Sequence, residues 1–202
     1  MGARCERVVG LAFDAYVRGD PDGVGPVEEL DERIDRDELE IHALILRILA
    51  LRQPVADDLR FLAMALRLIT DLERVGDEAI NITERTVKDD GDAKSLVGSD
   101  LAAMAGAARD MLHEALDALV QFDSEAAEHV LGRDEAVDRG CATVIAAMTA
   151  HMSRNPSDVR AGLRVIRVAK YLERIADHAT NVAEQVIFMV RGDDVRHGQW
   201  RR

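Results

Sequence analysis

The sequence is poor in residues that interrupt helices and in aromatic side chains. Among 202 residues there are four prolines, two tyrosines, four phenylalanines and one tryptophan. With abundant Ala, Leu, Glu, Asp and Arg, this composition is typical of long helices packed through aliphatic side chains. An apolar share of 48% can fill the core of one domain or of two small ones.

Cysteine and long apolar runs are also scarce. Cys5 and Cys141 are too few for a disulfide framework or a cysteine zinc site. Arg47 interrupts the segment ALILRILAL, so no run approaches the roughly 18 apolar residues of a membrane span. The N-terminus lacks the apolar region of a secretory signal. We therefore expect a reduced, soluble, cytoplasmic protein without stable membrane insertion.

Positive charge is in deficit, since the net charge is −12. An acidic protein is repelled by nucleic-acid backbones and by anionic membranes, so neither is expected as a partner. The charge suits solubility, cation binding or docking to basic partners, and by itself it does not choose among them.

The most informative pattern is an internal repeat. Residues 72–84 (LERVGDEAINITE) and 172–184 (LERIADHATNVAE) are identical at seven of 13 aligned positions. This similarity indicates a duplication with an offset of one hundred residues. The chain should therefore be read as two related halves.

Apolar spacing and capping residues predict three helices in each half. The expected helices cover about residues 3–18, 21–52, 55–88, 100–122, 124–153 and the segment from the RNPSD turn to about 191. Asp20 and either Asp123 or Ser124 are the expected N-caps. Residues 88–100 (KDDGDAKSLVGSD) read as a linker, and the tail 193–202 as frayed. The predicted fold is all-α, a tandem repeat of two three-helix bundles over residues 1–90 and 98–192.

Each half offers two pairs of acids one helical turn apart. Glu73 and Asp77 share one side of a helix, together with Asn81 and Glu84. Their copies are Glu173, Asp177, Asn181 and Glu184, and a second pair on the preceding helix, Asp31 and Asp35, recurs as Asp134 and Asp138.

If the long helices pack antiparallel, the pair on one could face the pair on the other. Four converging carboxylates repel unless protons or a cation neutralise them, and oxygen-rich sites suit magnesium, manganese or iron.

Other interpretations of these residues remain open. Acids four residues apart often belong to a solvated helix face. Arg74 and Arg174 are interpreted as partners of nearby acids, and His178 as a surface residue. Glu38 and His42 extend the first acidic row, but Cys141 and Ile145 occupy the aligned positions, so neither is a required ligand.

At these positions the sequence resembles the PhoU family of phosphate uptake regulators. The resemblance covers essentially the whole chain, and its most specific segments are ALRQPVADDLR (50–60), DLERVGDEAINITE (71–84) and YLERIADHATNVAE (171–184). It implies a multinuclear metal cluster on each bundle, iron in the first place, with manganese, zinc, nickel or magnesium as alternatives. The implied ligands are Asp31, Asp35, Glu73 and Asp77 in the first half, and Asp134, Asp138, Glu173 and Asp177 in the second. Asn81 and Asn181 are implied as additional ligands.

The resemblance also implies a regulatory role rather than an enzymatic one. Proteins similar to PhoU act between the ATPase subunit of the phosphate ABC transporter and a sensor histidine kinase, and they damp the phosphate-starvation response. A homodimer is a further expectation. The alternatives are a metal-free helical scaffold of the same fold and a di-metal redox enzyme. The enzyme is disfavoured because a ferritin-like site needs Glu-x-x-His, a motif missing from the chain.

Overall fold

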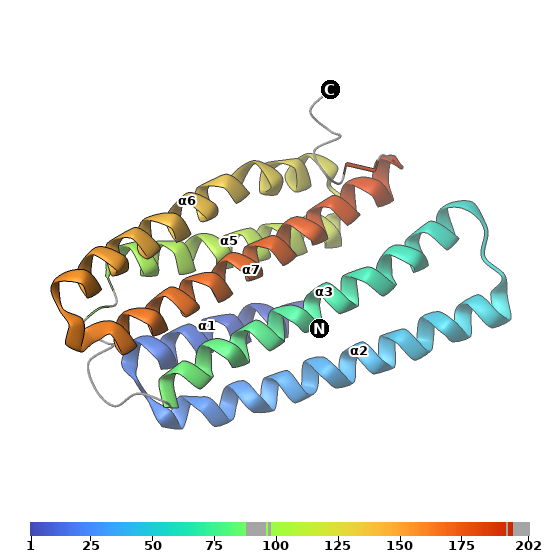
Figure 1. Cartoon of the computed structure of the whole chain (residues 1–202). Coiled ribbons are helices and arrows are strands. Elements are labelled where there is room, and N and C mark those ends of the chain that lie inside the picture. Colours follow the sequence, from blue (N-terminus) through green and yellow to red (C-terminus); the bar gives the residue numbers. More distant parts are fainter. Residues whose placement is uncertain (88–95, 97, 193, 196–202) are drawn as a thin grey trace.

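A computed structural model describes residues 1–87, 96, 98–192, 194 and 195, and within this part of the chain all regular structure is helical (Figure 1). The described residues include six long helices, and two of the connections between them contain a 3-10 turn. The elements are α1 (Gly2–Arg18), η1 (Pro21–Gly23), α2 (Val24–Arg52), α3 (Ala56–Val87), α5 (Ser99–Gln121), α6 (Ser124–Arg154), η2 (Pro156–Asp158) and α7 (Val159–Arg191).

The predicted helix starts agree closely with the structure. Asp123 Oδ1 accepts hydrogen bonds from the backbone N–H groups of Glu125 and Ala126, at 2.9 and 3.0 Å. Asp20 Oδ1 accepts one from Asp22, at 3.1 Å, and so caps the 3-10 turn that leads into α2. Helix α5 begins one residue earlier than expected, because Gly98 rather than Asp100 precedes its first turn.

The helices form two bundles joined side by side. Helices α1, α2 and α3 make the first bundle, and α5, α6 and α7 make the second, while α3 packs against α7 between them (Figure 1). This arrangement confirms the predicted tandem repeat of three-helix bundles. Most of the expected linker 88–100 and of the tail 193–202 lies outside the described residues.

One continuous core fills both bundles and the space between them. Val75 and Ile82 on α3, and Ile175 and Val182 on α7, are completely buried. Alanines such as Ala79 and Ala179 lie among them, which allows the helix backbones to approach closely. The acidic sides of α3 and α7 are therefore held in place by the opposite, apolar sides of the same helices. None of the described helices combines the length and apolar character that crossing a membrane requires.

Candidate metal centres

In the first bundle, the acids of α2 face the acids of α3. A Cβ atom added to Gly76 of α3 would lie only 2.5 Å from Asp31 Oδ1, so this carboxylate rests against the backbone of α3. Asp35 follows one turn later on α2, and Glu73 and Asp77 flank Gly76 on α3. We call Asp31, Asp35, Glu73 and Asp77 the first acidic group.

The electrostatics of this group show how close its members lie. The pKa of Asp31 is raised to about 6, first by burial and then by repulsion from Asp35, Asp77 and Glu73. Burial and the charge of Asp77 also raise the pKa of Glu73. The four carboxylates therefore share one region of negative potential that protons or a cation would relieve.

The second bundle repeats the arrangement with a tighter core of ligand atoms. Asp134 and Asp138 on α6 and Asp177 on α7 each offer an oxygen, and these oxygens lie within 4.8 Å of one another. Burial, followed by Asp134, Glu173 and Asp138, raises the pKa of Asp177 to about 6. The pKa of Asp134 is raised as well, by burial and by Asp138 and Glu173. We call Asp134, Asp138, Glu173 and Asp177 the second acidic group.

Equivalent oxygens in the two groups are buried without a hydrogen-bond donor. These are Asp31 Oδ1 and Asp134 Oδ1, which occupy matching positions in the repeat. A buried carboxylate oxygen without a donor is costly, and a cation is a natural partner for it. The possible metal ligands in each group are carboxylate oxygens only, and such ligands suit hard and borderline cations. The residues present therefore fit the metal sites that the sequence predicts.

Basic side chains neutralise part of each group, in different ways. Arg74 lies 3.0 Å from Asp77 and 3.4 Å from Glu73. Its counterpart Arg174 instead reaches across to Glu78 of α3, at 3.2 Å. Both arginines thus pair with nearby acids, as predicted.

In the second bundle, Lys170 takes over part of the role of Arg74. Its ammonium contacts both carboxylate oxygens of Glu173, at 2.6 and 3.0 Å. The buried thiol of Cys141 lies beside Glu173 and Lys170, and burial raises its pKa. Glu173 is therefore already paired with Lys170, and the oxygens of Asp134, Asp138 and Asp177 remain as the ligands for a cation.

Asn81 and Asn181 point elsewhere, into the contact between α3 and α7. Asn181 Nδ2 donates to Asp71 Oδ1 at 2.9 Å, and Asn81 Nδ2 donates to Glu78 Oε2 at 3.3 Å. Both amides thus have carboxylate partners outside the two acidic groups, and a ligand role for them stays a prediction.

The polar contact between the bundles was not foreseen from the sequence. Besides the bond from Asn181, Asp71 Oδ2 accepts a hydrogen bond from Gln185 Nε2 at 3.5 Å, and Asp71 Oδ1 lies 3.0 Å from His178 Nδ1. His178 is only 20% exposed, so its interpretation as a surface residue is wrong. We call this cluster of Asp71, His178, Asn181 and Gln185 the Asp71 clamp. Neither Asp71 nor His178 is shared by the two halves, since their aligned residues are Tyr171 and Glu78. The internal repeat therefore does not indicate this cluster.

The raised pKa values predict that the ion-free protein is more stable at pH 5 than at pH 7.5. Asp31 and Asp177 have folded pKa values of about 6 against an ordinary value of 3.8, so the stabilisation from protonation is lost as pH rises through 6. Allowing for solvent screening, we expect about 1 kcal/mol from each group. Urea unfolding at the two pH values in a chelator measures it, and the double variant Asp31→Asn, Asp177→Asn should show a clearly smaller difference.

Substitution of Gly76 should act selectively on the first acidic group. In Gly76→Ala the new Cβ would force the flexible end of Asp31 away from its place against α3. We expect one class of Mn²⁺ sites in calorimetry to weaken by about tenfold. Gly140→Ala on α6 is the control, because its Cβ would meet Met104 at an ordinary 3.7 Å. Equal Mn²⁺ binding in the two variants would contradict the placement of Asp31 in a site.

The comparison with known proteins agrees with this architecture. The model of the PhoU domain matches twice, over residues 1–86 and 101–186. A phosphate-specific transport system accessory protein PhoU homolog of Pseudomonas putida is 37% identical over 198 residues, which is 98% of this chain and 77% of that protein. A homolog of the same description from Caulobacter vibrioides is 35% identical over 196 residues, with 96% of this chain and 85% of that protein covered.

Solved structures give the same result. The crystal structure of PhoU from Pseudomonas aeruginosa superposes with a TM-score of 0.88 at 34% identity, covering 96% of this chain and 93% of that one. The regulatory protein PhoU from Streptococcus pneumoniae has the same TM-score at 23% identity, over 96% of this chain and 91% of that one, and supports the fold alone.

Proposed function

The chain belongs to the PhoU family of phosphate-transport accessory proteins, and on that premise we propose that it is a metal-binding regulator of phosphate uptake and signalling. In this proposal it acts in the cytoplasm between the ATPase subunit of a phosphate ABC transporter and a sensor histidine kinase. It damps the starvation response when phosphate is plentiful, and it does so as an adaptor rather than as an enzyme.

The observation that supports metal binding most directly is the pair of buried oxygens, Asp31 Oδ1 and Asp134 Oδ1. Each lacks a hydrogen-bond donor, and each lies among three further carboxylates of its own bundle. A lone acidic pair on a solvated face would not place matching unsatisfied oxygens in both halves. The acids of each group would hold the ions by carboxylate oxygens alone.

The chain's own residues explain how such a site could influence the fold. When bound, an iron cluster, or manganese, zinc, nickel or magnesium, would supply the positive charge that each group lacks. Asp31 and Asp35 on α2 would then be drawn toward Glu73 and Asp77 on α3, and the hairpin would tighten. Arg74 and Lys170 already supply part of this positive charge from the same helix as their partners, and they would have to release Asp77 and Glu173 to a full ligand set.

A metal-free scaffold of the same fold is the second candidate. The ion pairs of Arg74 and Lys170 favour it, because they show that the acids have protein partners of their own. A di-metal redox enzyme has less support: the tightest group of carboxylates among the described residues contains three aspartates and no histidine, whereas ferritin-like sites use Glu-x-x-His.

The regulatory role is tested with a phosphate-repressed reporter in the natural host. Deleting the gene should raise reporter output in high phosphate, on the order of tenfold, because a coupling of 1–3 kcal/mol between sensor states would be lost. Returning the intact gene should restore repression. A reporter that stays off in the deletion strain at high phosphate would count against negative regulation by this protein.

A further inference from the structure

Three exposed leucines continue the acidic face of the first bundle toward the turn between α2 and α3. Leu39 and Leu46 follow Asp35 by four and eleven residues on α2, so all three point within about 40° of one direction. Leu59 precedes Asp77 by 18 residues on α3, which is five whole turns, and points the same way as Asp77. These leucines are 67%, 49% and 46% exposed, and we call them the leucine stripe.

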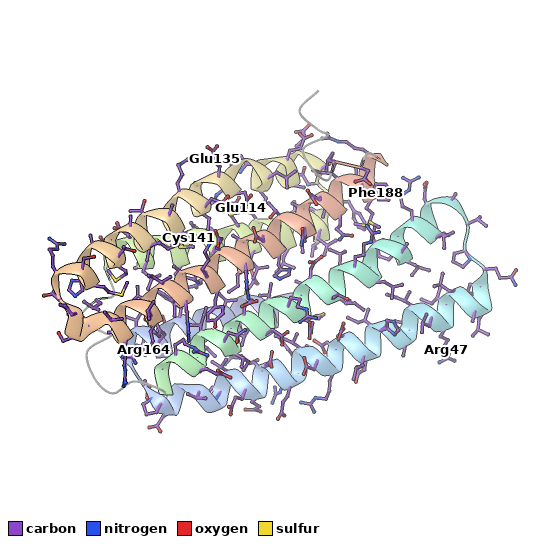
Figure 2. All side chains as sticks on the ribbon, viewed as in Figure 1. Arg47, Glu114, Glu135, Cys141, Arg164 and Phe188 are labelled. Carbon is purple, nitrogen blue, oxygen red and sulfur yellow. The ribbon has the colours of Figure 1, made fainter. Side chains whose placement is uncertain are left out.

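The leucine stripe and the first acidic group form one surface. Helices α2 and α3 run antiparallel and are joined at residues 53–55, so the leucines on both helices lie on the turn side of the acids. Leu66, half-buried and eleven residues before Asp77, fills the space between them on α3. From Asp35 to the level of Leu59 the surface is about 20 Å long. Exposed His42, seven residues after Asp35, lies on this surface between Leu39 and Leu46. The side chain of Arg47 lies on the side of α2 turned away from α3 (Figure 2).

The fold does not require leucine at these positions, as the second bundle shows. Four and eleven residues after Asp138, α6 carries Ala142 and Thr149 instead of leucine. On α7 two exposed apolar residues remain, Val159 and Leu163, which lie 18 and 14 residues before Asp177 and are 40% and 46% exposed. The same architecture is therefore built with small and polar residues on α6 at positions where α2 carries exposed leucines. An exposed apolar stripe that continues over both helices of the hairpin in one half only is the pattern of a binding surface rather than of a packing need.

The charges beside the stripe indicate what kind of partner fits. A surface with leucines along its length and carboxylates at one end complements a helix with an apolar stripe and basic residues. An anionic membrane would be repelled by the acids. A second copy of the chain, docked face to face, would bring its own acidic group against this one, and like charges across an interface are costly.

We propose that the leucine stripe and the first acidic group together dock an amphipathic helix of a partner protein. Its apolar side chains lie on Leu39, Leu46 and Leu59, and its lysines or arginines lie over the acids of α2 and α3. A helix of about 14 residues spans the surface. The proposal rests on the adaptor role proposed above and concerns the ion-free protein, in which no cation competes with the partner's basic residues for the first acidic group.

The test is a titration of the full-length protein, treated with EDTA, against the peptide LKKLLKLLKKLLKL-amide, which carries fluorescein on its N-terminus. The double variant Leu39→Gln, Leu46→Gln should weaken binding of this peptide by about tenfold, because two apolar contacts are lost. The matched control is Val159→Gln, Leu163→Gln, which removes exposed apolar residues from α7 and should change binding less than twofold. Hydrogen exchange should show protection by the peptide within residues 35–66.

Three results would overturn the proposal. The first is that the peptide shows no saturable binding to the wild type. The second is that the two double variants weaken peptide binding equally. The third is that the wild type is a dimer and the Leu39→Gln, Leu46→Gln variant is a monomer. The last would assign the surface to a second copy of the chain. Because metal is removed beforehand, failure of the metal sites leaves these outcomes unchanged, and the reporter strain tests the regulatory role separately.

Discussion

Replacement of Asp71 by alanine is expected to lower the free energy of unfolding by about 3 kcal/mol, because three side chains of α7 lose the carboxylate that they share as a hydrogen-bond partner. The Asp71 carboxylate is 16% exposed and gathers three side chains of α7 at 2.9 to 3.5 Å. Without it, His178, Asn181 and Gln185 would face a half-buried gap between the bundles. Urea unfolding at pH 7.5 measures the effect.

The matched control is Asp14→Ala on α1. Asp14 is 55% exposed and forms only a long ion pair with Arg18, at 3.7 Å, so its removal should change stability by less than about 0.5 kcal/mol. If the two variants unfold alike, the clamp contributes nothing to the contact between α3 and α7. Two unfolding transitions in Asp71→Ala, where the wild type has one, would show that the clamp couples the bundles.

Saturation with a cation that fits the two acidic groups should stabilise the protein by more than Asp71→Ala destabilises it. At a free concentration one hundred times Kd, binding to the folded state alone is worth about 2.7 kcal/mol for each site. Two sites together should raise Tm by roughly 10 to 20 °C for a chain of this length. Differential scanning calorimetry of EDTA-treated protein with added Mn²⁺ measures the shift.

A variant with Glu73, Asp77, Glu173 and Asp177 changed to alanine should lose this shift. Its ion-free form should unfold no earlier than the ion-free wild type, because the substitutions remove like charges as well as ligands. A control with Glu29, Glu32, Glu125 and Glu135 changed to alanine alters four exposed acids on α2 and α6 and should keep the shift. Equal Mn²⁺ shifts in the two variants would mean that the cation acts elsewhere on this acidic surface.

The fold could be predicted because the physics that determines it is local and repeated. Helix ends coincide with capping residues such as Asp123, whose side chain can reach only the next few N–H groups. The apolar periodicity of residues 56–87 and 159–191 identifies one buried side of each long helix. The two acidic pairs of each half also follow from spacing, since acids four residues apart must share a helix side.

The details of the acidic groups depend on contacts between distant residues. That Arg74 pairs with Asp77 while Arg174 turns to Glu78 could not be derived from the LER motif, which is the same in both halves. The glycine at position 76 was visible in the sequence, but only the antiparallel packing of α2 and α3 shows that it makes room for Asp31. In the Asp71 clamp, Asp71 lies more than one hundred residues from its partners on α7, so no local sequence pattern indicates the contact.

Elemental analysis of the untagged protein shows whether the two acidic groups hold metal ions. We expect several equivalents of iron, manganese or zinc in the wild type, and a loss of this metal when Glu73, Asp77, Glu173 and Asp177 are changed to alanine. The control that alters Glu29, Glu32, Glu125 and Glu135 should keep the wild-type content. Equal, negligible metal in all three proteins would rule out metal binding by these groups, and the acids would then belong to helix packing and partner docking.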